Sequence, residues 1–589
     1  MIVGFEKTTS LDAFGLSVLV EKGALRRITF GGHEVVRLID YPVRDANWGT
    51  LSMVTENQNA SGKTLLRHFR TADGAIQGRF DASIAPAANG VRISADLVLT
   101  ATRQTLVNRA GFIVLHPLAG VVGEPLCVRH ADGRTENLCF PTQISPAQPV
   151  LDITGINHRV GDIEVSIVFG GEVFEMEDQR NWTDASFKTY CRPLALPRPY
   201  DLYAGAETRQ SITVTLTRLA TAARHVAPDR HGVASVMPEV LLAHEDAITG
   251  APHPEIASTG ARGVLLRADA GMGALPGLDL LPDCAITLEL VTGQDAATDI
   301  TAAHKAVTEA GLKVKRAVAL TRDYLKSHQP AGPWPGGPAP MDMVAMVRHA
   351  FPGVRVGGGA LSNFTEFNRC PPDPALVDFV TFGTTAIVHA ADDLSVIETL
   401  EAIPQVIAST RALSGELPLH LGLMSIAMRS NPYGAGVVPN PHGERLPMAM
   451  ADPRQYTPFA AAFAIALAAA CVRGGVASFA PAMTGGPLGM AGEDGPWPLW
   501  HAVAALAALS GASVMVDGAS ASGLITIKGK GRRGIAGVSA NLGPAHADID
   551  GPAVLVPVGA SADWIDGAGS GGPLTLAPMT AAILREVTA

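Results

Sequence analysis

The sequence is poor in charged and in aromatic side chains, which make up 17% and 5% of its 589 residues. Acidic residues outnumber basic ones, 55 to 45, and the net charge is −10. Binding to nucleic acid or to an anionic membrane requires clustered lysine and arginine, and the sequence has no long basic run. Neither kind of partner is therefore expected.

Long apolar segments and cysteine pairs are also missing. The longest apolar run, residues 459–472, is shorter than the roughly 20 residues that a membrane-spanning helix needs. The first residues lack the basic and apolar regions of a secretory signal. The six cysteines form no CxxC pair, so we expect reduced thiols in a cytoplasmic protein.

The short motifs of two large hydrolase classes do not occur either. A GxSxG nucleophile turn is missing, which argues against a serine esterase of the α/β-hydrolase type. No HExxH or comparable histidine spacing is present, so no metal or other cofactor is expected. A divalent ion held by scattered carboxylates stays open at this point.

Alternating apolar and polar residues dominate the first part of the chain. Residues 91–103, 111–117, 163–169 and 211–218 are examples, and Gly, Asp and Asn turns separate them. Helical periodicity is nearly absent in this part. The pattern predicts an N-terminal β-sandwich domain over residues 1–228.

From residue 229 to residue 511, short apolar strands alternate with helical stretches. The predicted strands cover residues 238–244, 263–269, 285–291, 314–321, 354–361, 378–384, 418–425 and 476–481. The predicted helices cover residues 297–311, 340–351, 394–415, 457–475 and 498–511. Eight such strands are typical of a (β/α)8 barrel. We favour the barrel over a doubly wound open sheet because no glycine-rich phosphate loop follows the first strand. Residues 512–589 return to a β pattern and predict a small C-terminal β-domain.

Catalytic groups of such a barrel lie at the carboxyl ends of its strands, and two residues there are suited to proton transfer. Glu366 follows the fifth predicted strand and could act as a general base or acid. It also fits a capping box with Asn363, so a purely structural role is equally consistent with the sequence. His389 follows the sixth strand, and an imidazole transfers protons near neutral pH.

Other polar side chains at the same strand ends are candidates for binding substrate. Arg267 and Asp269 end the second predicted strand, Asn363 follows the fifth, and Arg429 follows the seventh. Guanidinium groups suit carboxylate or polyol oxygens, although each arginine could equally form a salt bridge at the rim.

Residues 174–190, FEMEDQRNWTDASFKTY, concentrate side chains that are rare elsewhere in the chain. One interpretation is structural, with Asp178 paired to Arg180 and Asp184 paired to Lys188. The other is that the segment lies over the barrel mouth, where Trp182 would stack on a sugar. Asp178 and Asn181 are then further substrate-binding candidates, as is Glu175.

Several segments together resemble the D-apionate lactonase family. They are FEMEDQRNWTDASFKTYCRPLALPRPY at residues 174–200, GFIVLHPLAGVVGEPLCVRHADG at 111–133, LSNFTEFNR at 361–369 and AIVHAADD at 386–393. The resemblance extends over most of the chain. It implies a bacterial hydrolase of apiose catabolism that opens D-apionolactone to D-apionate.

We therefore expect an enzyme that hydrolyses the lactone of a sugar acid, with a small sugar lactone or sugar acid as its partner. Glu366 or His389 would activate water, and donors such as Arg429 would stabilise the oxyanion. A glycoside hydrolase that pairs Glu366 with Asp269 or Asp323 is the alternative. A binding protein without turnover, and assembly into a homo-oligomer, also stay open.

Overall fold

The computed structural model describes residues 9–219, 233–269, 284–518, 523–549, 551–567 and 572–586. The chain divides into two compact units. The sheet-rich unit consists of Glu6–Arg180 and Ala185–Pro228, and the barrel unit of Met1–Phe5, Asn181–Asp184 and Asp229–Ala589. Four residues inside the sheet-rich part of the sequence, Asn181–Asp184, therefore belong to the barrel unit.

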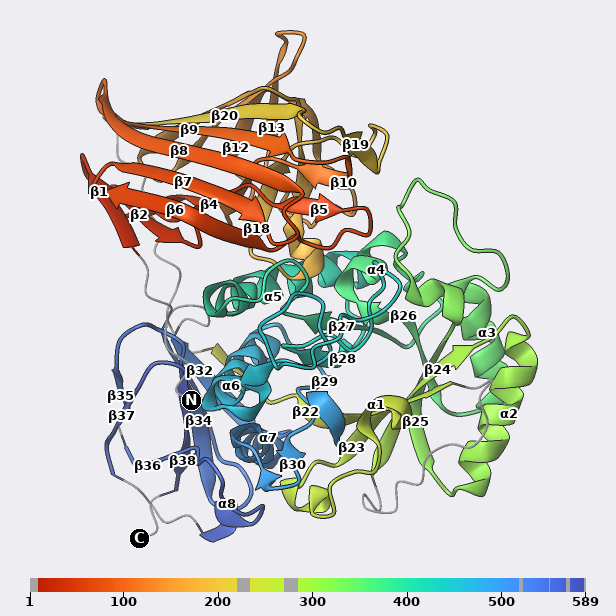
Figure 1. The fold of residues 1–589 in the computed structure, drawn as a ribbon. Coiled ribbons are helices and arrows are strands. Elements are labelled where there is room, and N and C mark those ends of the chain that lie inside the picture. Colours follow the sequence, from red (N-terminus) through yellow and green to blue (C-terminus); the bar gives the residue numbers. More distant parts are fainter. Residues whose placement is uncertain are drawn as a thin grey trace. The chain divides into compact units, whose positions relative to one another are not determined.

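The sheet-rich unit contains two large antiparallel sheets, seen in red to yellow in Figure 1. The first has the strand order β1 (Thr9–Ala13), β2 (Leu16–Glu21), β3 (Ala24–Phe30), β4 (His33–Asp40), β11 (Ile113–Pro117), β18 (Ser186–Tyr190), β17 (Phe174–Asp178), β14 (Val150–Ile153). The second has the order β13 (Thr135–Cys139), β12 (Pro125–Arg129), β15 (Gly155–Val160), β16 (Ile163–Gly170), β20 (Glu207–Arg218), β9 (Gly90–Ala101), β8 (Ile76–Ala87), β7 (Thr64–Thr71), β6 (Met53–Ser61). A short third sheet has the order β19 (Tyr200–Leu202), β10 (Thr105–Ala110), β5 (Val43–Asp45).

The two large sheets share an aromatic core. Tyr41, which follows β4 of the first sheet, lies 5.1 Å from Phe69 and 4.6 Å from Phe80 of the second sheet, measured between ring centroids. Strands such as β9 bury every second side chain, because successive residues of a strand point to opposite faces. The predicted β-sandwich is thus confirmed, since the sheets bury their apolar faces against each other.

A closed barrel of eight parallel strands forms the centre of the barrel unit. The strands are β22 (Glu239–His244), β23 (Gly263–Asp269), β24 (Ala285–Thr292), β25 (Lys313–Thr321), β26 (Arg355–Asn363), β27 (Phe379–Thr385), β28 (His420–Ser425) and β29 (Ser478–Ala480). Each of the eight predicted strands corresponds to one of them. The strands are apolar runs because a parallel barrel strand is covered on both faces.

Helices α1 (Asp246–Thr249), α2 (Ala296–Glu309), α3 (Pro340–Ala350), α4 (Phe364–Arg369), α5 (Asp393–Ser414), α6 (Pro458–Arg473) and α7 (Pro498–Leu509) belong to the same unit. Their starting points follow local sequence signals. Asp392 caps α5 by accepting a hydrogen bond from the backbone N–H of Ser395, and Thr457 caps α6, whose first residue is Pro458. Among the described residues, no helix is both long enough and apolar enough to cross a membrane.

Five strands of the C-terminal residues, blue in Figure 1, form a six-stranded sheet with β21 (Val233–Val236) within the barrel unit. Its order is β21, β32 (Ser513–Gly518), β33 (Leu524–Gly529), β34 (Ile535–Asn541), β38 (Thr580–Arg585), β36 (Ala553–Leu555). β35 (Ala547–Ile549) pairs with β37 (Leu574–Leu576), and α8 (Trp564–Gly567) lies between β36 and β37 in sequence. Helix α6 packs against β34 and β38. The sheet includes β21, a strand that precedes the barrel in sequence.

Candidate active site

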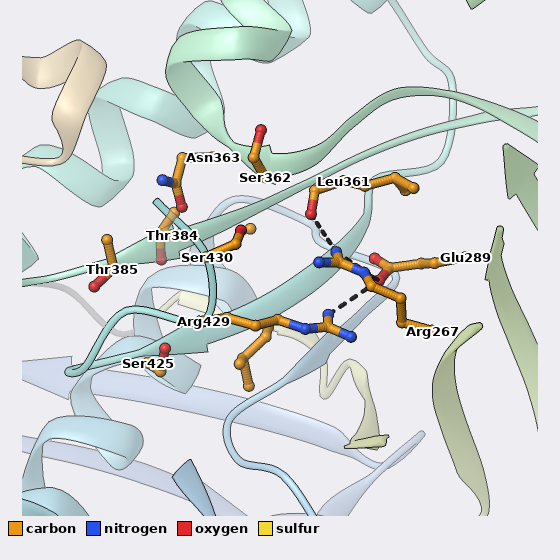
Figure 2. A pocket seen from close by; sticks show the side chains of 12 residues that line it. Arg267, Glu289, Leu361, Ser362, Asn363, Thr384, Thr385, Ser425, Arg429 and Ser430 are labelled. Carbon is orange, nitrogen blue, oxygen red and sulfur yellow. Dashed lines mark hydrogen bonds and ion pairs between the residues drawn. The ribbon is translucent and has the colours of Figure 1, made fainter. Parts of the chain in front are cut away.

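A narrow polar pocket lies at the carboxyl ends of five barrel strands (Figure 2). Its lining residues come from β23, β24, β26, β27, β28 and the loop after β28: Arg267, Glu289, Leu361, Ser362, Asn363, Gly383, Thr384, Thr385, Leu423, Ser425, Arg429 and Ser430. The carboxyl end is where (β/α)8 barrels place their catalytic groups. Most of these side chains carry a hydroxyl, amide or charged group, so the pocket suits a hydroxylated ligand.

Glu289 is the centre of a buried charge cluster in this pocket. Its carboxylate accepts hydrogen bonds from Nε of Arg267 at 2.9 Å and from Nη1 of Arg429 at 3.0 Å. Figure 2 shows the two guanidinium groups converging on it. Arg267 also donates to the carbonyl oxygen of Leu361. Burial and the neighbouring Arg429 lower the pKa of Arg267, and Glu289 opposes this shift.

Arg429 connects Glu289 to a second carboxylate. Its Nε lies 2.7 Å from Oε2 of Glu245, the residue that follows β22. Burial alone would raise the pKa of Glu245, but the charges of Arg429 and Arg267 outweigh burial and lower it. The two guanidiniums therefore face two carboxylates, and the cluster is electrically balanced.

One donor of this cluster has no partner among the described residues. Nη2 of Arg429 is buried and makes no hydrogen bond within the part of the chain that the structure describes. The Arg429 side chain is 8% exposed, and its other two nitrogens are held by Glu245 and Glu289. A buried donor without an acceptor is unfavourable unless a ligand or water supplies one. A carbonyl oxygen of a bound substrate would be a suitable acceptor.

Glu289 and Glu245 were not among the residues predicted from the sequence. Glu289 stands in the apolar run AITLELVT of β24, and an isolated acid in a strand that is buried on both faces is the signal that could have identified it. Glu245 directly follows β22, so the rule that selected the ends of other strands also applies to it.

Arg267 lines the pocket as predicted for a substrate-binding residue, but Asp269 is placed differently. Asp269 ends β23 and forms an ion pair with Arg322, whose side chain is largely exposed. Asp269 is not among the pocket-lining residues. The structure thus places this carboxylate in a rim salt bridge.

Asn363 lines the pocket, while Glu366 is buried behind it in α4. Oε2 of Glu366 accepts hydrogen bonds from the Ser362 hydroxyl at 3.0 Å and from the backbone N–H of Asn363 at 3.1 Å. In a capping box the acid at the third helical position accepts a hydrogen bond from the backbone N–H of the N-cap residue. The contact between Glu366 and the N–H of Asn363 is this hydrogen bond, as predicted. Burial raises the pKa of Glu366, and its hydrogen bonds and the charge of Arg369 oppose the shift. The carboxylate lines a different hollow, together with Tyr324, His328 and Trp334.

His389 lies in the loop between β27 and α5 and is paired with a carboxylate. Its Nδ1 is 2.6 Å from Oδ2 of Asp184, one of the four residues that join the barrel unit from the middle of the sheet-rich sequence. The ring of Trp182 meets the His389 ring edge-on at 5.5 Å between centroids. Asp184 was not predicted as a site residue, because its sequence neighbours pointed to Lys188 as its partner.

Trp182 and Asn181 contact residues around the pocket. The Trp182 ring lies 6.4 Å from the ring of Tyr433, and the Tyr433 hydroxyl is 3.3 Å from Nδ2 of Asn363 in the pocket wall. Asn181 Oδ1 accepts a hydrogen bond of 2.8 Å from Nδ2 of Asn368 in α4. The structure thus places Trp182 and Asn181, both predicted from the sequence, against the loop after β28 and against helix α4, which follows β26.

Asp178 has a different environment from its neighbours in sequence. It forms a fully buried ion pair with Arg180, 2.6 Å from Oδ2 to Nη2, as the structural interpretation predicted. Its Oδ2 also accepts the backbone N–H of Ser145 in the sheet-rich unit. The predicted pair of Asp184 with Lys188 is wrong. In the β17–β18 hairpin Lys188 stands opposite Glu177, and these two lie 2.5 Å apart.

The described residues contain no group of three His, Cys, Asp or Glu side chains arranged to hold a metal ion. The pocket offers a buried guanidinium donor and a wall of hydroxyl and amide groups, and His389 in the loop after β27 forms an imidazole–carboxylate pair with Asp184. Together they can activate water and stabilise an oxyanion.

Comparison with known proteins identifies the family of this chain. The family models for the N-terminal domain and the TIM barrel domain of D-apionate lactonase match residues 5–219 and 268–511. A D-apionate lactonase from Brucella anthropi is 34% identical, over 86% of this chain and 88% of the relative. The chain belongs to the D-apionate lactonase family. As a member of that family it is an enzyme that hydrolyses lactones, and the glycoside hydrolase alternative is not favoured.

Solved structures similar to this D-apionate lactonase family member are distant. A GH36 alpha-galactosidase from Geobacillus stearothermophilus has a TM-score of 0.27 and 10% identity, over 99% of this chain and 100% of the other. A galactose mutarotase-like protein from Lactobacillus casei has a TM-score of 0.27 and 9% identity, over 36% of this chain and 100% of the other. Likenesses of this size carry no argument about substrate.

Proposed function

We propose that this lactone hydrolase opens a polyhydroxylated lactone of a sugar acid, D-apionolactone or a close analogue, to the aldonate during carbohydrate breakdown. The observation that carries the proposal is the pocket wall: hydroxyl and amide side chains surround Arg429, whose Nη2 is buried without a partner among the described residues. The named activity of the Brucella anthropi relative is consistent with it. Hydroxyls on the ring of the substrate would form hydrogen bonds with these side chains.

In the proposed reaction the lactone carbonyl oxygen accepts a hydrogen bond from Nη2 of Arg429. His389 takes a proton from water as the water oxygen bonds to the carbonyl carbon. The oxyanion that forms stays near Arg429, where a fixed donor in a buried site stabilises it most strongly. The ring C–O bond then breaks, and the imidazolium of His389 returns its proton to the departing alkoxide. The products are a hydroxyl group and a carboxylic acid, which ionises.

The cluster around Glu289 gives Arg429 its orientation in this mechanism. Glu245 and Glu289 each hold one nitrogen of its guanidinium. The third nitrogen is therefore fixed before substrate arrives, which avoids the entropy of ordering a long side chain during the reaction.

The test is to measure hydrolysis by the purified protein of D-apionolactone, of other aldonolactones and of γ-butyrolactone, which has the ester but no hydroxyls. We expect kcat/KM for a polyhydroxylated lactone to exceed that for γ-butyrolactone by about 10⁴-fold, because the unsubstituted ring leaves polar groups of the pocket unpaired. Hydrolysis of every sugar lactone at only its spontaneous rate would contradict the proposal, as would equal activity on γ-butyrolactone.

A further inference from the structure

Residues 181–184 form a strap that the structure fixes at the barrel. The backbone oxygen of Asn181 accepts a hydrogen bond of 2.6 Å from the Thr365 hydroxyl, and its side-chain oxygen accepts one of 2.8 Å from Asn368. Both donors belong to α4, directly after β26. The start of the strap is thereby held against an element that borders the pocket.

The backbone of the strap is strained at its third residue. Thr183 has a φ of 71°, in the left-handed region that a β-branched residue rarely adopts. Such a conformation is unfavourable and persists only where surrounding contacts determine it. Strained residues are concentrated at functional sites. The residue that follows this strained position is Asp184.

The contact made by Asp184 has the geometry of a carboxylate that orients an imidazole. Oδ2 lies 2.6 Å from Nδ1 of His389, although the two residues are 205 positions apart in sequence. Both side chains are partly exposed, 16% for Asp184 and 25% for His389, so water can reach the pair. The edge contact with Trp182 holds the imidazole from another side. The ring is thus restrained in both rotation and position.

We propose that Asp184 is a positioning residue that makes His389 an effective base, a role that rests on the proposed function. Nδ1 carries the proton and donates a hydrogen bond to the Asp184 carboxylate. Nε2 therefore carries the lone pair, which accepts a proton from water. The carboxylate also stabilises the imidazolium that forms in this step, as in hydrolases that pair histidine with aspartate. The negative charge stays on Asp184 throughout, and the proton on Nδ1 does not leave the ring.

The experiment combines kinetics with a spectroscopic readout of the tautomer. Asp184→Asn and Asp184→Glu are compared with wild type on the sugar lactone that wild type hydrolyses fastest. The amide of Asn would donate to Nδ1 and impose the opposite tautomer, whereas Glu keeps the carboxylate. We expect kcat of Asp184→Asn to fall by about 10²- to 10⁴-fold with KM changed little, and Asp184→Glu to recover most of that loss.

The tautomer is read from ¹⁵N shifts of labelled histidine, and His389→Gln identifies the signal of His389. Wild type should show a protonated Nδ1 and an unprotonated Nε2, and Asp184→Asn should reverse them. Asp548→Asn, at an exposed acid that accepts a hydrogen bond from Thr575, serves as the control and should match wild type in kcat. The proposal is overturned if Asp184→Asn retains its kcat, or if wild-type Nε2 carries the proton. If wild type hydrolyses no lactone, the proposed function fails by itself, and the ¹⁵N shifts still report whether Asp184 orients His389.

Discussion

Nη1 of Arg429 lies 3.0 Å from Oε2 of Glu289, whose side chain is 2% exposed. This contact joins the seventh strand's loop to the third strand across the interior of the barrel. Two positive and two negative groups share the site, because Arg267 and Glu245 complete the cluster. Removing one of these four side chains leaves an opposite charge of the cluster without its partner. We expect the substitutions to differ in how much they lower stability and how much they lower activity.

Glu289→Gln should destabilise the barrel unit strongly. The substitution leaves Arg267 and Arg429 with a neutral amide in a buried site, and loss of one member of a buried ion pair costs about 3–5 kcal/mol. Urea unfolding followed by circular dichroism measures the change. Glu245→Gln is the matched control, since Glu245 is 24% exposed and its loss should cost less. Equal destabilisation by both variants would contradict the central role of Glu289.

Arg429→Lys should reduce kcat/KM by about 10²- to 10³-fold, the effect of losing one donor to an oxyanion. Lysine keeps the charge but cannot hold both carboxylates and still present a third fixed nitrogen. The assay is hydrolysis of the preferred sugar lactone. Arg445→Lys, at a partly exposed arginine paired with Asp393, should leave kcat/KM unchanged. Unaltered hydrolysis by Arg429→Lys would exclude this arginine as the donor.

Trp182→Ala should raise KM about tenfold while the urea midpoint changes little. The indole is half-buried beside His389 and Tyr433, so its removal takes away a surface on which a sugar ring can stack rather than a core contact. Trp182→Phe keeps an aromatic surface and should restore most of the affinity. A large loss of stability with unchanged KM would assign Trp182 a structural role instead.

Asp178→Asn should lower the free energy of unfolding of the sheet-rich unit by about 3–5 kcal/mol, because Arg180 would remain charged in a fully buried position. An exposed pair in the same unit offers the comparison. Glu207→Gln breaks the contact with Arg209 at a side chain that is 43% exposed, and it should change stability by less than about 0.5 kcal/mol. Chemical denaturation measures the free energy of unfolding of both variants. A loss in Asp178→Asn as small as that in Glu207→Gln would contradict the prediction.

Stability should decrease as the pH falls below about 6.5, the usual pKa of an unfolded histidine. Burial lowers the pKa of His420 to about 3 and that of His501 to about 4. Between about pH 6.5 and the folded pKa, each histidine binds a proton in the unfolded chain but not in the folded chain. The free energy of unfolding therefore decreases as the pH falls through this range. At about pH 5 each histidine costs about 2 kcal/mol.

The measurement is the urea midpoint at about pH 7 and at about pH 5. His420→Gln removes one titrating group and can retain a hydrogen bond to Ser478, which His420 contacts at 2.8 Å. Its midpoint should therefore fall less between the two pH values than that of wild type. An identical pH dependence in the variant would show that His420 becomes protonated as easily in the folded state as in the unfolded one.

The barrel could be predicted from the sequence because its strands are distinct apolar runs between helices. The predicted strand 285–291 is β24 at Ala285–Thr292, and 378–384 is β27 at Phe379–Thr385. Strand β21 was not predicted, because its four residues precede the first barrel strand and pair with β32, far along the chain. Local patterns record burial, but they do not record which distant edge a short strand will join.

The site was only partly predictable for the same reason. Arg267 and Arg429 were found by the rule that strand ends carry function, while Glu289 looked like one polar residue in an apolar strand. The contact of Asp184 with His389 spans 205 residues, and no local spacing indicates it. The mistaken pairing of Asp184 with Lys188 joined two nearby charges of one segment, whereas the register of the β17–β18 hairpin places Lys188 opposite Glu177.

The assignment of Asn181–Asp184 to the barrel unit has a consequence for the integrity of the enzyme. A polypeptide that begins after residue 228 contains every barrel strand and still lacks Asp184. A single proteolytic cut between β17 and β18 would likewise leave all eight barrel strands intact while severing the segment that carries this carboxylate. On the proposed role of Asp184, a fragment without this carboxylate would lose most of its activity even where its barrel folds correctly.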